Sequence, residues 1–290
     1  MVEYLISEFS SGKRVATLSR GYGRKTKGFL KANQNSTPDQ IGDEPFQIFQ
    51  KYGDEVSVFV GEDRVAALEQ IKSSEERIEL VILDDAFQHR AVQAHVNILL
   101  TTYQKPFSSD FLLPMGRLRE YRSGATRADV VILTKSPEGL TRTKKGELKS
   151  SISNYLVPET PVLFSSISYG EPYAIREGMK FKPDIVLVSG IANPKTLEDH
   201  LDQNYNLLKS LRYADHQNYT GTDAKEIEKI VSSFEEKPVL MITEKDADKV
   251  KLLLDSGFLE EIPIFVQPIQ VQFSPEDESI LRELITRKIG

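Results

Sequence analysis

Apolar residues follow two patterns along the chain, and these two patterns alternate. Continuous apolar runs, which predict strands buried on both faces of a sheet, occupy residues 15–19, 56–60, 80–85, 97–101, 130–134, 184–189 and 238–243. Apolar residues at helical spacing predict helices over residues 2–9 (ended by Gly12), 45–50, 65–71, 194–201, 223–234 and 246–254. Because strands alternate with helices, we predict an α/β fold built on a parallel sheet.

A change of organisation is predicted near residue 165. Pro158 and Pro161 bracket a break in the strand and helix pattern. Segment 162–180 alternates polar and apolar residues, which favours a ribbon that links two domains. We therefore expect a first domain over residues 1–165 and a smaller α/β domain over residues 166–290.

Composition excludes or disfavours only some classes of function. A length of 290 residues is enough for one large or two medium domains. The net charge of −6 disfavours nucleic acid as a partner, and the absence of cysteine excludes disulfides and cysteine-based zinc sites. No apolar run approaches the roughly 20 residues of a membrane span, and no signal-peptide pattern is visible.

The most informative polar cluster follows the apolar run 80–83. Asp84, Asp85, Gln88, His89 and Arg90 come directly after it. Open α/β sheets bind ligands at the carboxyl ends of their strands, and Mg²⁺ prefers one or two carboxylates together with substrate phosphate. The alternative is a solvated junction between strand and loop. Five polar residues within seven positions favour a Mg²⁺–phosphate site.

A second candidate is the glycine-rich basic loop 19–28, which follows a predicted strand. Four cations within eight residues of this loop suit a phosphate ligand. The alternatives are a flexible solvated loop or, through stacking of Tyr22 on a base, a nucleic-acid contact. Gly61-Glu62-Asp63-Arg64 repeats the pattern of polar residues at a strand end, but it is weak evidence alone.

Three further motifs leave a structural and a functional interpretation open. Segment 42–45, Gly-Asp-Glu-Pro, is typical of a helix start, or it holds a carboxylate as a base or metal ligand. Asp215 next to His216 can tune an imidazole near neutral pH. Segment 243–246 is a helix cap, or its Lys245 reaches a phosphate.

Segment 112–120, Leu-Leu-Pro-Met-Gly-Arg-Leu-Arg-Glu, joins an apolar stretch to a basic one. Such a mixture suits a substrate with acyl chains and a phosphate, or a membrane surface. The alternative is a packed loop with solvated arginines.

Taken in order, these blocks resemble the tetraacyldisaccharide 4′-kinase family, the lipid A kinases of Gram-negative bacteria. The resemblance implies a P-loop NTPase-like kinase core with a smaller second domain. It implies ATP- and Mg²⁺-dependent phosphorylation of the 4′-hydroxyl of a tetraacyldisaccharide 1-phosphate, the lipid A disaccharide precursor. It also implies a peripheral position at the cytoplasmic face of the inner membrane, with neither nucleic acid nor an obligate protein partner.

The resemblance assigns roles to individual residues. Asp43 matches the catalytic base, partnered by His216 from the second domain. Asp84 and Asp85 match the acids near Mg²⁺, with Glu44 assisting. The residues that match the surroundings of the substrate's sugar and phosphate are Arg20, Tyr22, Arg64, Gln88, His89, Arg117 and Arg119.

One part of the family pattern is not found. The family carries a Walker A loop before the first helix of its core, and the 290 residues contain no Gly-x₄-Gly-Lys. Gly12-Lys13 cannot substitute, because it precedes a predicted strand, whereas a P-loop lysine opens a helix. We therefore expect weak ATP binding and little turnover from these residues alone. The alternative function is a non-catalytic protein that binds the lipid disaccharide.

Overall fold

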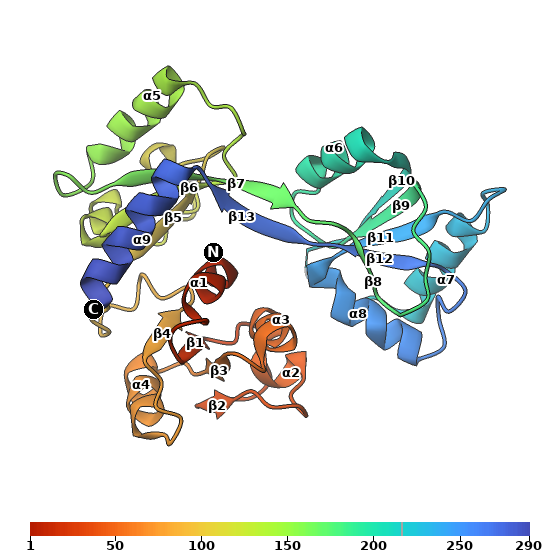
Figure 1. The fold of residues 1–290 in the computed structure, drawn as a ribbon, viewed down its shortest axis with the longest axis horizontal. Helices are drawn as coiled ribbons and strands as arrows, with labels where there is room; N and C mark the ends of the chain where they lie inside the picture. Colours follow the sequence, from red (N-terminus) through yellow and green to blue (C-terminus); the bar gives the residue numbers. More distant parts are fainter. Residues whose placement is uncertain (216) are drawn as a thin grey trace. The chain divides into compact units, whose positions relative to one another are not determined.

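The computed structural model describes residues 1–215 and 217–290, which form two compact units (Figure 1). The first unit comprises Met1–Ser168 and Gln270–Gly290, and the second comprises Tyr169–Ile269. The chain therefore leaves the first unit close to the expected residue 165. Its last segment returns to the first unit, however, whereas we expected residues 166–290 to stay together.

The first unit contains two four-stranded sheets. One has the order β2 (Leu30–Lys31), β3 (Ser57–Val60), β1 (Val15–Ser19), β4 (Leu80–Leu83), and its strands are parallel except for β2. The other has the order β13 (Ile269–Phe273), β7 (Val162–Tyr169), β6 (Val130–Thr134), β5 (Ile98–Thr102), with β5, β6 and β7 parallel. The predicted strands are thus confirmed to within one or two residues.

Helices cover these sheets and join them. They are α1 (Val2–Phe9), α2 (Pro38–Ile41), α3 (Asp43–Tyr52), α4 (Arg64–Ser73), α5 (Arg142–Ser153) and α9 (Pro275–Ile289), with 3₁₀ turns η1 (Phe107–Ser109) and η2 (Arg122–Arg127). Ile6 of α1 and Leu281 of α9 are buried in one apolar cluster with Ile82 of the first sheet and Ile132 of the second. An ion pair of 2.5 Å between Glu8 and Arg282 links the same two helices.

Segment 162–180 links the two units as predicted, because the chain passes from the first unit to the second between Ser168 and Tyr169. Its first part is β7, whose first four residues are buried in the second sheet of the first unit. One detail of the helix prediction is wrong. Helix α1 ends at Phe9, and its C-cap is Ser10 rather than Gly12.

A groove of about 1330 Å³ lies between the two sheets of the first unit. Strands β4 and β5 line it, together with Met1 and Leu5 at α1 and Ile285 and Ile289 of α9. Each of these two strands is the outermost strand of its sheet among the described residues. Their apolar side chains are consequently only partly buried.

The second unit has one sheet of order β10 (Asn206–Arg212), β9 (Asp184–Ser189), β11 (Val239–Thr243), β12 (Ile264–Gln267), β8 (Tyr173–Ala174), parallel except for β8. Alternate residues of β9 and β11 face two separate apolar clusters. One cluster includes α7 (Gly221–Val231) and α8 (Glu244–Asp255), and the other includes α6 (Lys195–Asn204). The continuous apolar runs therefore arise because both faces are buried, as predicted.

In the part of the chain that the structure describes, no helix combines the length and apolar character that crossing a membrane requires.

Candidate active site

Asp84 and Asp85 begin the candidate site, directly after β4. The backbone N–H of Asp84 donates to the carbonyl of Leu18 at 3.0 Å and extends the pairing of β4 with β1. Asp85 then adopts a φ of 45°, a left-handed conformation that aspartate tolerates better than most residues. The polar run 84–90 consequently lies at the carboxyl end of the parallel strands, where the sequence predicts it.

The environment of the Asp84 carboxylate disfavours its negative charge. Burial raises its pKa above the ordinary value, and the charge of Asp85 adds to this effect. A hydrogen bond from the backbone of Asp85 and the charge of Arg64 act in the opposite direction without cancelling it. A cation bound here would stabilise the ionised form, because it would replace the hydration that Asp84 loses.

Arg119 holds Asp85 through two hydrogen bonds. Its Nη1 donates to Oδ2 at 3.1 Å and its Nη2 donates to Oδ1 at 2.5 Å. This contact raises the pKa of Arg119. Both side chains are more than half exposed, so the pair orients the carboxylate more than it stabilises the fold.

Glu120, which the sequence analysis does not assign to the site, connects several of its members. Its carboxylate accepts hydrogen bonds from Arg127 at 2.7 Å, from Arg90 at 2.9 Å and from Gln88 at 3.5 Å. The bond from Arg127, the largest contribution, holds the pKa of Glu120 below its ordinary value. Only its position beside Arg119 in the sequence hinted at this role.

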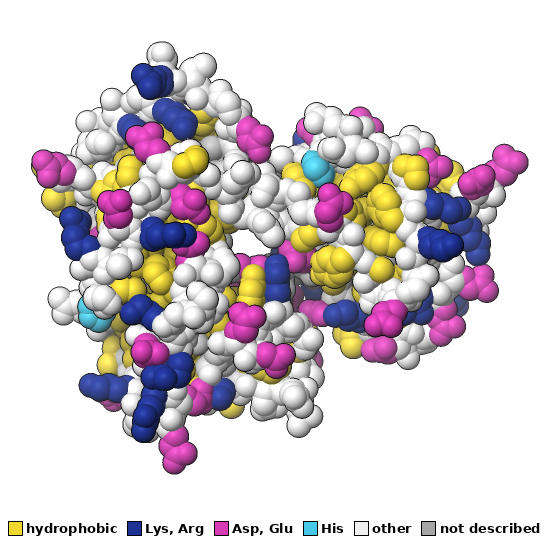
Figure 2. Space-filling model, viewed as in Figure 1, with side chains coloured by type: hydrophobic (Ala, Val, Ile, Leu, Met, Phe, Trp, Pro, Cys, Tyr) yellow, Lys and Arg dark blue, Asp and Glu magenta, His cyan; other side chains and the backbone are white. Residues whose placement is uncertain are grey.

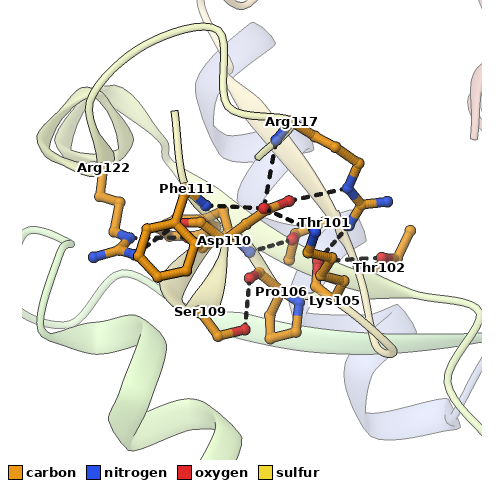
Figure 3. A network of polar contacts seen from close by, with 10 residues as sticks. Thr101, Thr102, Lys105, Pro106, Ser109, Asp110, Phe111, Arg117 and Arg122 are labelled. Carbon is orange, nitrogen blue, oxygen red and sulfur yellow. Dashed lines mark hydrogen bonds and ion pairs between the residues drawn. The ribbon is translucent and has the colours of Figure 1, made fainter. Parts of the chain in front are cut away.

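Arg117 belongs to a different cluster, although the sequence treats it like Arg119. Its Nε donates to the carboxylate of Asp110 at 2.9 Å, and its Nη2 donates to the carbonyl of Lys105 at 3.1 Å (Figure 3). The structure therefore brings Arg119, and not Arg117, into hydrogen bonding with the predicted aspartates.

The start of α3 lies against the glycine-rich basic loop because two glycines allow a close approach. A Cβ on Gly42 would lie 3.0 Å from the backbone of Gly21, and a Cβ on Gly21 would lie 2.6 Å from the carbonyl oxygen of Ile41. Both glycines also have positive φ. Asp43 and Glu44, the first two residues of α3, are thereby placed next to this loop.

The four cations of the loop do not all face a ligand, which corrects the expectation from their density. Arg24 is almost fully buried and donates to Glu62 and to the Gly28 carbonyl, both at 2.6 Å. Lys25 pairs with Asp39 at 2.6 Å. These two side chains stabilise the loop itself. Arg20 and Tyr22 are exposed, and Tyr22 is the extreme case at 84% exposure.

Arg64 is a buried cation close to the aspartates. Its Nη1 donates to the carbonyl of Gly61 at 2.5 Å, and its buried Nε has no hydrogen-bond partner. Burial lowers its pKa, and the charge of Arg20 lowers it further, while Asp85 and Asp84 raise it. A buried guanidinium with an unused donor favours an anionic ligand at this position.

In the second unit, Lys245 pairs with Asp215 at 2.5 Å. The motif 243–246 does form a helix start, because Thr243 is the N-cap of α8 and its hydroxyl donates to Asp246 at 2.7 Å. The predicted partner of Asp43, His216, lies outside the described residues, so the Asp43–His216 pair remains a prediction.

A magnesium ion fits the residues present. The groove of the first unit is lined by Asp84 and Asp85, and Glu44, Gln88, His89 and Arg119 border the same groove. No three acidic or histidine side chains form a ready-made metal site among the residues that the structure describes. Mg²⁺ does not need such a set, since it takes one or two carboxylates and fills its remaining positions with phosphate oxygens and water.

Comparisons with known proteins identify the family to which the chain is similar. The model of the family described as tetraacyldisaccharide-1-P 4′-kinase matches residues 1–289. The chain is 39% identical to the tetraacyldisaccharide 4′-kinase of Cytophaga hutchinsonii, over 99% of this chain and 81% of that protein. It is 36% identical to that of Phocaeicola vulgatus, over 98% of this chain and 80% of that protein.

A crystal structure of LpxK from Aquifex aeolicus in complex with ATP has the same fold. It matches 100% of this chain and 83% of that chain with a TM-score of 0.73 and 25% identity. The predicted P-loop NTPase-like α/β fold is therefore confirmed. Together with the family match, this shows that the chain belongs to the tetraacyldisaccharide 4′-kinase family, a family of phosphoryl-transferring enzymes.

Proposed function

We propose that this protein transfers the γ-phosphoryl group of ATP to the 4′-hydroxyl of a tetraacyldisaccharide 1-phosphate at the cytoplasmic face of the inner membrane. The observation that supports it most is the Asp84–Asp85 pair at a strand end, where burial raises the pKa of Asp84. Family membership supports the kinase class and the lipid A precursor. The ATP complex of the Aquifex protein supports the nucleotide.

In this proposal Asp84 and Asp85 hold Mg²⁺, with Glu44 nearby. Bound Mg·ATP supplies the phosphoryl group and neutralises charge on the phosphates. Asp43 accepts the proton of the sugar hydroxyl, and His216 orients and polarises Asp43. Most of the rate enhancement comes from positioning and charge neutralisation.

The sugar and its phosphate are held by cations and polar groups around this edge of the sheet. They are Arg20, Tyr22, Arg64, Gln88, His89 and Arg119, with Arg117 in the neighbouring Asp110 cluster. Arg64 contributes a buried donor with no partner, and Arg119 keeps Asp85 in place. Lys245 contributes positive charge toward the nucleotide. On the face shown in Figure 2, Lys and Arg are interspersed with Asp and Glu, which suits a small anionic ligand better than a nucleic acid.

We propose that these 290 residues bind ATP weakly by themselves. Gly12 and Lys13 follow α1 and precede β1, and Lys13 Nζ donates to the carbonyl of Gly290 at 3.3 Å. No other Gly-Lys pair is present, so the lysine that normally contacts the β- and γ-phosphates is not supplied by this segment. The second candidate is a protein that binds the lipid disaccharide without phosphorylating it.

Phosphorylation of tetraacyldisaccharide 1-phosphate by labelled ATP, together with binding of that lipid in detergent micelles, tests both candidates. We expect slow turnover that Asp84→Asn abolishes, while lipid binding is retained. Lys144→Gln, on exposed α5, is the matched control and should change neither quantity. Lipid binding with no turnover supports the second candidate. Turnover unaffected by Asp84→Asn contradicts the magnesium assignment.

A further inference from the structure

The loop between β5 and β6 exposes an unusual amount of apolar surface. Phe111, Leu113, Met115 and Tyr121 are 58%, 63%, 84% and 75% exposed. They border a shallow hollow of about 570 Å³ whose lining is mostly apolar, formed with Tyr155. Contiguous exposed apolar surface of this kind marks an interaction site rather than ordinary surface.

A buried carboxylate fixes the conformation of this loop. The Asp110 side chain is only 3% exposed and accepts hydrogen bonds from the Phe111 N–H and from Arg117 Nε, both at 2.9 Å, with Lys105 at 3.1 Å (Figure 3). Burial opposes ionisation of Asp110, but these donors outweigh it and hold its pKa well below the usual range. The exposed apolar side chains are therefore held on a rigid base.

Backbone hydrogen bonds within the loop pair several of its own polar groups. Leu118 exchanges hydrogen bonds of 3.0 Å with Phe111 and Leu113, and the Gly116 N–H donates to Leu112 at 3.0 Å. A Cβ on Gly116 would lie 2.2 Å from the Phe111 carbonyl oxygen, so only glycine fits this closure. These paired groups can approach an apolar medium without being left unsatisfied.

Cations flank the apolar side chains. Residues 105–122 contain four cations, Lys105, Arg117, Arg119 and Arg122, but only two carboxylates, in a chain whose net charge is −6. Arg117 is 59% and Lys105 48% exposed. Apolar side chains inside a local excess of positive charge are complementary to an anionic lipid surface.

We propose that the loop over residues 110–122 is a membrane-contact element. It places Phe111, Leu113 and Met115 at the boundary between headgroups and acyl chains of an anionic bilayer. This inference deepens the proposed function, because Arg119 and Glu120 at the base of the same loop contact Asp85 and Gln88. Membrane contact through this loop would present the candidate site to a lipid substrate.

Co-sedimentation with vesicles tests this inference. The full 290-residue protein is mixed with vesicles of phosphatidylcholine and phosphatidylglycerol at a 3:1 ratio. We expect the double variant Leu113→Ser/Met115→Ser to reduce partitioning by about tenfold or more, because both apolar anchors are lost. Leu252→Ser, which changes an exposed leucine (61%) of α8 in the second unit, is the matched control and should change little. Circular dichroism verifies that all variants are folded.

Unchanged partitioning of the double variant, or an equal loss in the Leu252 control, would overturn the inference. Binding of tetraacyldisaccharide 1-phosphate in detergent micelles separates this test from the proposed function. If the unmodified protein binds the disaccharide but the double variant partitions to vesicles equally well, only the membrane inference is wrong. If the unmodified protein does not bind the disaccharide but the double substitution lowers partitioning as expected, only the proposed substrate is wrong. If the double variant loses micellar binding alone, the loop holds the substrate's acyl chains and the membrane inference is wrong.

Discussion

The two units contain strands of similar sequence in different surroundings. In the second unit, β9 and β11 have neighbours on both sides, and all of β11, Val-Leu-Met-Ile-Thr, is buried. In the first unit, β4 has the equally apolar sequence Leu-Val-Ile-Leu, yet three of its four residues are only partly buried beside the groove. An apolar run thus predicts a strand that is able to be buried, but not how many neighbours cover it.

The same contrast holds for polar groups at the strand ends. Asp246, beside β11, is 1% exposed and accepts hydrogen bonds from Gly190 N–H, Tyr219 and Thr243. Burial of the Tyr219 hydroxyl raises its pKa, and the charge of Asp246 raises it further. Asp84, after β4, has a raised pKa instead, because burial and Asp85 outweigh its partners. Asp246 is satisfied by three donors and stabilises the structure, whereas the charge of Asp84 is disfavoured and would be stabilised by a bound cation.

The largest expected difference between the units is in how much the free energy of unfolding falls when a strand leucine is replaced by alanine. Leu240→Ala in β11, at 0% exposure, should lower the free energy of unfolding by about 2–5 kcal/mol, because it leaves a cavity that cannot collapse. Leu83→Ala in β4 should cost about 1 kcal/mol, since its side chain is already partly solvated. Urea denaturation followed by circular dichroism measures both. Equal costs would contradict the contrast between an interior strand and an outermost strand.

Backbone exchange should show the next largest difference. Strand β4 pairs only with β1 among the described residues, so the amides that point away from β1 have no strand partner. We expect these amides to exchange at least about a hundredfold faster than amides of β9 and β11, which lie in the sheet interior. Hydrogen exchange followed by mass spectrometry or NMR measures this. Slow exchange in β4 and β5 would show that another chain segment or molecule covers the groove in solution.

Substitution of the two carboxylates should have a smaller effect, of opposite sign. Asp246→Asn should destabilise the protein by about 1–3 kcal/mol, because an amide cannot accept all three hydrogen bonds. Asp84→Asn should be neutral or stabilising, since it removes a charge that burial disfavours.

The pH dependence gives the sign of the Asp84 effect. A folded-state pKa above the unfolded value means that the folded protein binds the proton more tightly. Stability contributed by Asp84 is therefore present at low pH and is lost as pH rises from the ordinary value of 3.8 through the raised pKa. The difference in stability between the unmodified protein and Asp84→Asn should show this loss. A difference that grows in the other direction would contradict the raised pKa.

The smallest effect is expected for the Asp85–Arg119 pair. A double-mutant cycle with Asp85→Ala and Arg119→Ala should give a coupling energy of about 0–1 kcal/mol in stability, because both groups are more than half exposed. Thermal unfolding of the four proteins measures it. A coupling above this range would mean that the pair is a structural element rather than a positioning contact.

Local signals were sufficient for much of the fold and part of the site. Residues 130–134 form β6 as predicted, and α3 begins at the acids of the Gly-Asp-Glu-Pro block. The polar run 84–90 lies at a strand end as expected. These features depend on hydrophobic period and on turn residues, which neighbouring positions in the sequence already encode.

Other features depended on contacts between distant residues. Arg117 and Arg119 look alike in sequence, but one contacts Asp110 and the other Asp85. Glu120 becomes a hub only because Arg127 and Arg90 reach it. Arg24 donates through its Nη2 to Glu62, 38 residues further along the chain, so that nitrogen is not available to a phosphate.

The sequence by itself determined the alternation of strands and helices, the position of the acidic pair and the membership of a kinase family. Only the tertiary structure decided that residues 162–169 are an inner strand, that the C-terminal helix completes the first unit, and that β4 and β5 border a groove. The physical reason is that the spacing of apolar residues indicates which side of a helix or strand is apolar. Which partner covers that side, and which cation meets which carboxylate, is decided only when distant segments pack together.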